Sequence, residues 1–211
     1  MGHATRLTAD EATAIEAAVA AVEARSAGEV VIAIVERSGA YAGPRAALAA
    51  GLGVGLALGL HMLAPQLAIP WLLLAELPLA AVAWLLAGRG PLLRWLLPTP
   101  VRARQARAQA LQLFAERGIY ATRDATGLLI FISQLERQVI ILGDRGIHQH
   151  VGDAGWTAQV AQLTAGLRTH RLAPALLQVL ATLGDVLAQH FPRRADDINE
   201  LPDAILYADR P

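Results

Sequence analysis

Two long apolar runs interrupt a chain that otherwise mixes apolar and polar positions. The runs cover residues 46–64 and 69–88, with a connection of about five residues between them. A helix needs about 20 mostly apolar residues to cross the hydrocarbon core of a bilayer. A chain of 211 residues could hardly bury two such helices in a soluble fold. The pattern therefore predicts a two-helix transmembrane hairpin within residues 46–97, with the lipid bilayer as its surroundings.

The charged residues around the runs predict an orientation. The connection between the runs carries no charge, whereas arginines flank their outer ends at positions 45, 89, 94, 102, 104 and 107. Cytoplasmic flanks are the ones enriched in Lys and Arg. We therefore expect a multi-pass protein of the cell inner membrane whose soluble domain lies in the cytoplasm.

Small and ionisable residues inside the runs give two further interpretations. Gly51, Gly55 and Gly59 recur every four residues and share one helical face, which would pack against the partner span or form a homodimer. His61 and Glu76 are ionisable residues within the apolar runs. Such groups are functional candidates because they are costly in lipid. They would serve either as a structural polar pair or as an ion or proton relay through Glu76.

The segments outside the hairpin predict an α/β fold. The stretch 30–35 is β-branched and continuously apolar, which is typical of a strand buried on both faces. Two more strands at 127–133 and 137–142 form a hairpin, and the crossover between the first two strands makes them parallel. Helices are expected at residues 7–25 (with a Thr8/Glu11 capping box), 101–117, 156–167 and 172–190.

These elements assemble into a small mixed sheet sandwiched by helices. Residues 1–45 and 98–211 form this α/β domain, and residues 46–97 are inserted in its crossover. The charged segment 193–202 is interpreted as a solvated tail in preference to one that folds back on the sheet. No secretory signal is visible in the first ten residues.

Composition narrows the possible functions. Hydrophobic residues make up 55% of the chain and charged residues 17%, as expected for a membrane protein with one soluble domain. The net charge is zero, which gives no reason to expect nucleic-acid binding. Cysteine is absent, which excludes disulfides, thiolate metal sites and cysteine nucleophiles.

Several short motifs, taken in order, resemble the TPM domain family. They are residues 26–31 (SAGEVV), 114–123, 126–131 (TGLLIF), 136–139 (ERQV), 143–147 (GDRGI), Trp156, 190–192 (HFP) and 199–202 (NELP). The chain looks most like the bacterial predicted membrane proteins that carry the hairpin inside the domain. The resemblance implies a TPM-like sandwich. Some relatives are credited with weak acid phosphatase activity or calcium binding, and others with assisting the assembly or repair of membrane complexes.

Three residues near the strand ends are the candidates for a site. Glu29 precedes the first strand and Asp144 follows the third, so both can lie at one end of the sheet and hold a divalent cation such as calcium. Arg123 lies in the loop entering the second strand and would suit an anion such as phosphate. The alternatives are an arginine partner for Glu29 and a turn-capping role for Asp144. His148 and His150 are poor co-ligands if they lie in a helix, because they point about 200° apart.

The sequence names no reaction and no catalytic residue. The expected function is a membrane-anchored accessory module that interacts with membrane protein assemblies. The first alternative is a weak metal-dependent phosphatase or divalent-cation-binding domain. The second is the ion or proton relay through Glu76.

Overall fold

The computed structural model describes residues 7–63, 69–87, 90–194, 196 and 199–208, and its elements group into two compact units. One unit contains Ala40–Val101. The other, called here the α/β unit, contains Ala4–Gly39 and Arg102–Pro211. The α/β unit is thus assembled from two stretches of chain that lie on either side of Ala40–Val101 in the sequence.

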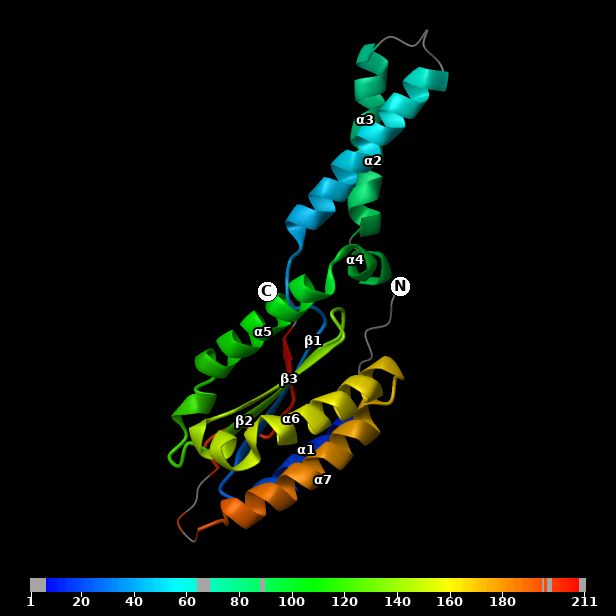
Figure 1. Ribbon diagram of the computed structural model, residues 1–211. Helices are drawn as coiled ribbons and strands as arrows, with labels where there is room; N and C mark the ends of the chain where they lie inside the picture. The colour runs from blue at the N-terminus through cyan, green and yellow to red at the C-terminus, as the bar shows by residue number, and fades with distance from the viewer. Residues whose placement is uncertain (1–6, 64–68, 88–89, 195, 197–198, 209–211) are drawn as a thin grey trace. The chain divides into compact units, whose positions relative to one another are not determined.

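The α/β unit is built on a four-stranded mixed sheet. Its strand order is β3-β2-β1-β4, in which β1 is parallel to both β2 and β4 while β3 is antiparallel to β2 (Figure 1). The strands are β1 (Glu29–Val35), β2 (Gly127–Ser133), β3 (Gln138–Gly143) and β4 (Leu206–Ala208).

Helices cover both faces of this sheet. Every residue of β1 and β2 is buried, because successive side chains point to opposite faces and each face meets helices. Val30, Ile32 and Ile34 face three helices, α1, α6 and α7, whereas Val31, Ala33 and Val35 face α5 (Figure 1). The helices are α1 (Ala9–Glu23), α5 (Thr99–Glu116), α6 (Arg145–Arg168) and α7 (Leu172–His190), with a 3-10 turn η1 at Ile119–Ala121.

Several predictions about this unit are confirmed. The sheet is mixed, β1 and β2 are parallel, and β2 and β3 form a hairpin. Helix α1 begins after Thr8, whose hydroxyl accepts a hydrogen bond from the Glu11 N–H while the Glu11 carboxylate accepts one from the Thr8 N–H, so the expected capping box is present.

Two predictions about the α/β unit are wrong. Helix α6 begins at Arg145, well before the expected start at residue 156, because Asp144 caps it directly after β3. The C-terminal segment is not a solvated tail. It leads into β4, which pairs with β1 from Ala33 to Val35 and so uses an edge that would otherwise have exposed unpaired backbone groups.

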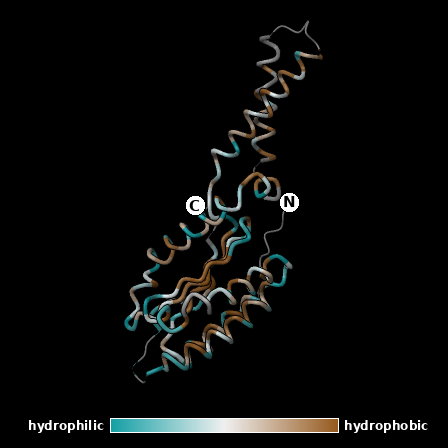
Figure 2. The backbone as a smooth tube through the Cα atoms, viewed as in Figure 1, coloured by the Kyte–Doolittle hydropathy of each residue, from teal (hydrophilic) through white to brown (hydrophobic). Residues whose placement is uncertain are grey.

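The other unit contains a pair of helices, α2 (Ala42–Leu63) and α3 (Ile69–Ala87), followed by the short helix α4 (Gly90–Leu96). Apolar and neutral colours predominate along α2 and α3 in Figure 2. Among the described residues, α2 and α7 are long and apolar enough to span a membrane. In α7, half of the long apolar stretch is buried in the core of the α/β unit. In α2, only 11% of the corresponding stretch is buried.

In the described part of the structure, the glycine face of α2 makes no close side-chain contact. Gly51, Gly55 and Gly59 are exposed, and a methyl group added at any of them would meet no atom of the described residues within 4 Å. The small residues of α2 that are buried are Ala49 and Gly53, which lie one helical turn apart. The buried side of α2 is therefore roughly opposite the three glycines, and partner-span packing by the glycines stays a prediction.

Candidate functional site

The sheet places Glu29 and Asp144 at the same end, as the topology argument requires. Glu29 stands opposite Gly127 in the parallel pairing of β1 and β2, and the Asp144 N–H donates a hydrogen bond of 2.9 Å to the Gly127 carbonyl. Because β2 lies between them and neighbouring strands are about 4.8 Å apart, the two backbones are about 10 Å from each other. Each carboxylate has its own surroundings.

The Glu29 carboxylate binds backbone of the C-terminal segment. Its two oxygens accept hydrogen bonds from the N–H groups of Glu200 and Leu201, both at 3.2 Å, and the side chain is buried. A buried carboxylate is stable only when its oxygens are hydrogen-bonded or paired. These bonds hold the segment that leads into β4 against the start of β1.

Asp144 is the N-cap of α6. Its Oδ1 accepts a hydrogen bond of 2.6 Å from the Arg145 N–H, and its carbonyl accepts one from the His148 N–H. The second carboxylate oxygen, Oδ2, is buried and finds no hydrogen-bond partner among the described residues. The capping role proposed as the alternative for Asp144 is therefore present, at the start of a helix.

We expect Asp144→Ala to lower the free energy of unfolding by about 1 kcal/mol, because it removes the N-cap of a long helix. Asp144→Asn retains an oxygen acceptor and should cost less. Urea unfolding followed by circular dichroism checks this. Equal losses for both variants would show that the negative charge of Asp144, and not the cap hydrogen bond, stabilises the start of α6.

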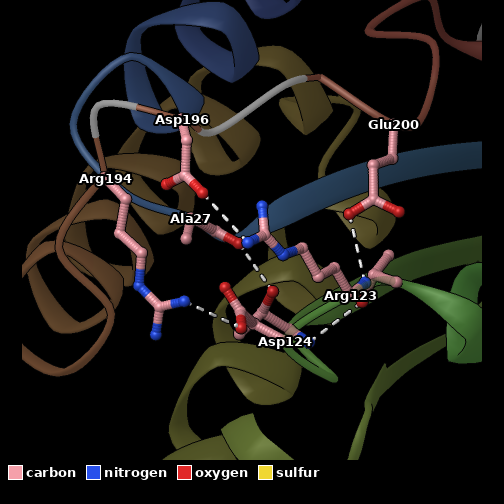
Figure 3. A network of polar contacts seen from close by, with 8 residues as sticks. Ala27, Arg123, Asp124, Arg194, Asp196 and Glu200 are labelled. Carbon is pink, nitrogen blue, oxygen red and sulfur yellow. Dashed lines mark hydrogen bonds and ion pairs between the residues drawn. The ribbon is translucent and has the colours of Figure 1, made fainter.

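Arg123 belongs to a network that joins the loop before β2 to the C-terminal segment (Figure 3). The Arg123 guanidinium forms an ion pair of 2.9 Å with Asp196. The backbone N–H of Arg123 donates a hydrogen bond of 3.1 Å to a Glu200 carboxylate oxygen. In the reverse direction, Arg194 pairs with Asp124 at 3.3 Å. Each of the two segments thus supplies one arginine and one aspartate to the other.

This network is exposed, which limits its strength. More than half of each side chain in the Arg123–Asp196 pair is accessible to solvent. The hydrogen bond and the charge of Arg123 lower the pKa of the Asp196 carboxyl. Exposed ion pairs contribute between zero and about 1 kcal/mol. The predicted anion-binding residue Arg123 is therefore occupied by carboxylates of its own chain.

Glu23 is a member of this end of the unit that the sequence analysis missed. It lies at the end of α1, where its Oε1 accepts the Val30 N–H at 3.0 Å and its Oε2 accepts the Asn199 side-chain amide at 3.3 Å. The pKa of Glu23 is raised to about 8, mainly because the side chain is buried; the Val30 hydrogen bond opposes the shift, and the nearby carboxylates of Asp203 and Glu29 add to it. Only tertiary structure buries this side chain.

The raised pKa of Glu23 predicts a pH-dependent stability. Between pH 4.5 and about 8 the folded protein keeps a proton on Glu23 that the unfolded chain has released, so stability falls as pH rises through this window. The limiting slope is about 1.4 kcal/mol per pH unit for one group. We expect Glu23→Gln, which cannot ionise, to have a flatter profile of unfolding free energy against pH.

Glu16→Gln is the matched control for this experiment. Glu16 is another carboxylate of α1 that binds backbone near the C-terminus, since its Oε1 accepts the Ile205 N–H at 3.2 Å. Its variant should keep the pH slope of the parent protein. A Glu23→Gln profile parallel to that of the parent between pH 5 and 8 would contradict the prediction.

The described residues form no cluster of metal-binding side chains. Among the residues described, no group of three or more His, Cys, Asp or Glu side chains could hold a metal ion. His148 and His150 lie in helix α6, where they are the poor co-ligands that their spacing implies. The His150 ring instead contacts the ring of His190 at the end of α7, with 4.8 Å between the centroids.

The two ionisable residues of the helix pair are only partly described. His61 is exposed near the end of α2. Glu76 belongs to α3, but its side chain is outside the part of the chain that the structure describes. The predicted pairing of His61 with Glu76 therefore stays a prediction.

Together these features define a mixed α/β protein in which the acidic end of the sheet holds its own C-terminal segment. No protein-family model and no curated protein matches the chain. Among solved structures, the chain is similar to the NMR structure of the BA42 protein from the psychrophilic bacterium Bizionia argentinensis. The TM-score is 0.61 and the identity 19%, over 99% of this chain and 100% of the other. This likeness shows that the two chains share a fold.

Proposed function

We propose that this protein is a membrane-anchored accessory module of the TPM type. In this proposal α2 and α3 cross the bilayer as a hairpin, and the α/β unit interacts with membrane protein assemblies from the cytoplasmic side. The observation that carries the proposal is the apolar exterior of the helix pair.

Large apolar side chains point outward along both helices. Leu58, Met62 and Leu63 of α2 are more than 60% exposed, and so are Leu77 and Leu85 of α3. In water, exposure of contiguous apolar surface on this scale marks an interaction or membrane surface. Further exposed apolar side chains are Leu52, Val54, Leu56, Leu60, Leu74, Val82 and Leu86.

The beginning of α2 and the end of α3 carry residues that are typical of a membrane–water boundary. The Arg45 guanidinium lies 4.4 Å from the centre of the Trp84 ring and donates a hydrogen bond of 3.1 Å to the Trp84 carbonyl. Arginine and tryptophan are typical of the interface, with arginine on the cytoplasmic side. This pair links the first turns of α2 to the last turns of α3, which supports one boundary at this end.

Cysteine labelling in intact cells tests the proposal, since the native chain has no cysteine. Gln66→Cys lies between the apolar runs and Gln149→Cys lies in α6. We expect an impermeant thiol reagent to label position 66 and to label position 149 only after the cells are lysed. Labelling of position 149 alone would overturn the orientation, and extraction of the protein by alkaline carbonate would overturn membrane insertion.

The outward glycine face of α2 supports the second of its two interpretations, a homodimer. We expect Gly55→Ile to lower the dimer fraction measured by cross-linking in membranes, because close helix contact requires small residues at the interface. Gly43→Ala, whose added methyl meets no atom of the described chain within 4 Å, is the control and should leave the dimer fraction unchanged. An unchanged dimer fraction for Gly55→Ile would exclude this face as the interface.

A further inference from the structure

Helix α5 has two faces of different character. Ala106 and Ala110 are buried and pack on β1 and β2. On the opposite side Arg104, Arg107 and Leu111 are exposed, with Leu111 47% accessible. Their spacings of three and four residues place these three side chains on one face. The core contact of α5 therefore fixes which side chains the α/β unit presents on this side.

The outward face of α5 is strongly positive. No acidic side chain in the described part of the structure pairs with Arg104 or Arg107. The sequence explains part of this positive charge. Between Glu76 and Glu116 the chain has five arginines and no acidic residue. The partner of this face must accept hydrogen bonds, carry negative charge and tolerate the exposed Leu111.

We propose that the outward face of α5, formed by Arg104, Arg107 and Leu111, binds the anionic phospholipid surface of the membrane that anchors the chain. This inference rests on the proposed function, which brings the bilayer close to α5. Only 11 residues separate α3 from α5, a reach of about 40 Å even when fully extended. Guanidinium groups bind phosphate oxygens in paired hydrogen bonds, and the leucine enters the boundary between headgroups and acyl chains.

The short stretch of chain between α5 and the proposed spans favours lipid over an acidic protein partner. Basic segments next to a membrane-spanning helix are attracted to the anionic cytoplasmic leaflet. Each arginine near that surface strengthens the attraction by roughly fivefold at physiological ionic strength. Loss of both Arg104 and Arg107 should therefore weaken docking of the face by roughly 25-fold on the same basis.

The test uses the full chain with Leu111→Cys, labelled with an environment-sensitive fluorophore and reconstituted in two kinds of lipid nanodisc. One kind contains phosphatidylcholine alone and the other also contains phosphatidylglycerol. We expect a blue shift of the label in the anionic discs only, reversed by high salt. Adding Arg104→Gln and Arg107→Gln should abolish the shift, whereas Arg168→Gln with Arg171→Gln, at the exposed α6–α7 turn, should preserve it.

The possible outcomes separate the two proposals. A chain that does not incorporate into either kind of disc contradicts the membrane anchor itself. A chain that incorporates but gives the same label spectrum in both kinds of disc contradicts lipid binding by α5 and leaves this face to an acidic protein. A shift that survives the Arg104 and Arg107 substitutions places the lipid contact elsewhere.

Discussion

We expect Gly127→Ala to lower the free energy of unfolding of the α/β unit by about 3 kcal/mol. Gly127 opens β2, and a methyl group there would overlap the Ile119 carbonyl oxygen and lie 2.9 Å from its carbon. Those atoms are backbone and cannot turn aside as a side chain can. The 3-10 turn η1 would have to move away from the start of the sheet, which breaks the packing of buried Ile119 against β2.

Urea unfolding of the purified full chain measures this effect. Trp156 is buried in the core of the α/β unit, so its fluorescence reports on that unit once Trp71, Trp84 and Trp95 are replaced by phenylalanine. At Gly43 an added methyl meets no described atom within 4 Å, so Gly43→Ala should leave the transition unchanged. A Gly127→Ala midpoint equal to that of the parent would show that η1 can shift at no cost.

Removal of the Glu136 carboxylate should also cost about 3 kcal/mol. Glu136 is fully buried in the turn between β2 and β3, where one oxygen accepts the Ser38 N–H at 2.9 Å and the other accepts the Ser133 hydroxyl. The Ser38 hydroxyl in turn donates to the Ser133 oxygen at 2.8 Å. Glu136→Ala leaves these donors buried without acceptors, and an unsatisfied buried donor costs about 1–3 kcal/mol.

Glu136→Gln is the matched variant, because it keeps the shape and one acceptor oxygen. It should retain the bond to Ser38 and lose much less stability than Glu136→Ala in the same urea experiment. Equal losses for the two variants would mean that the charge of Glu136, rather than its hydrogen bonds, stabilises this junction of Ser38, Ser133 and Glu136. Ser38 lies three residues past β1, so this junction fixes the chain just before it enters the α2–α3 unit.

The acidic end of the sheet illustrates why candidate sites were harder to predict than elements. Sheet order correctly placed Glu29 and Asp144 at one end, because a parallel crossover and a tight hairpin leave little choice of arrangement. Whether their carboxylates meet depends on the partners of each oxygen. Glu29 binds backbone of Glu200 and Leu201, and Asp144 binds backbone of α6, so both are used within the fold.

The sequence by itself determined the two apolar helices, the three main strands and the parallel crossover. Those features follow from local patterns: hydrophobic run length, β-branched strands and the capping box at Thr8. A hydrophobic repeat or a helix cap involves residues only a few positions apart, so each can be recognised from the sequence alone. The beginning of α6 was missed because its first turns lack the clear apolar stripe that marks α7.

Only the tertiary structure decided what the C-terminal segment and the buried carboxylates do. Strand β4 is three residues long and has no periodic signal; it forms because β1 offers an open edge and because Glu29, Arg123 and Glu16 hold the preceding segment in place. The raised pKa of Glu23 likewise requires burial by residues far away in sequence. Long-range partners such as these come together only when the sheet has folded, so no local pattern records them.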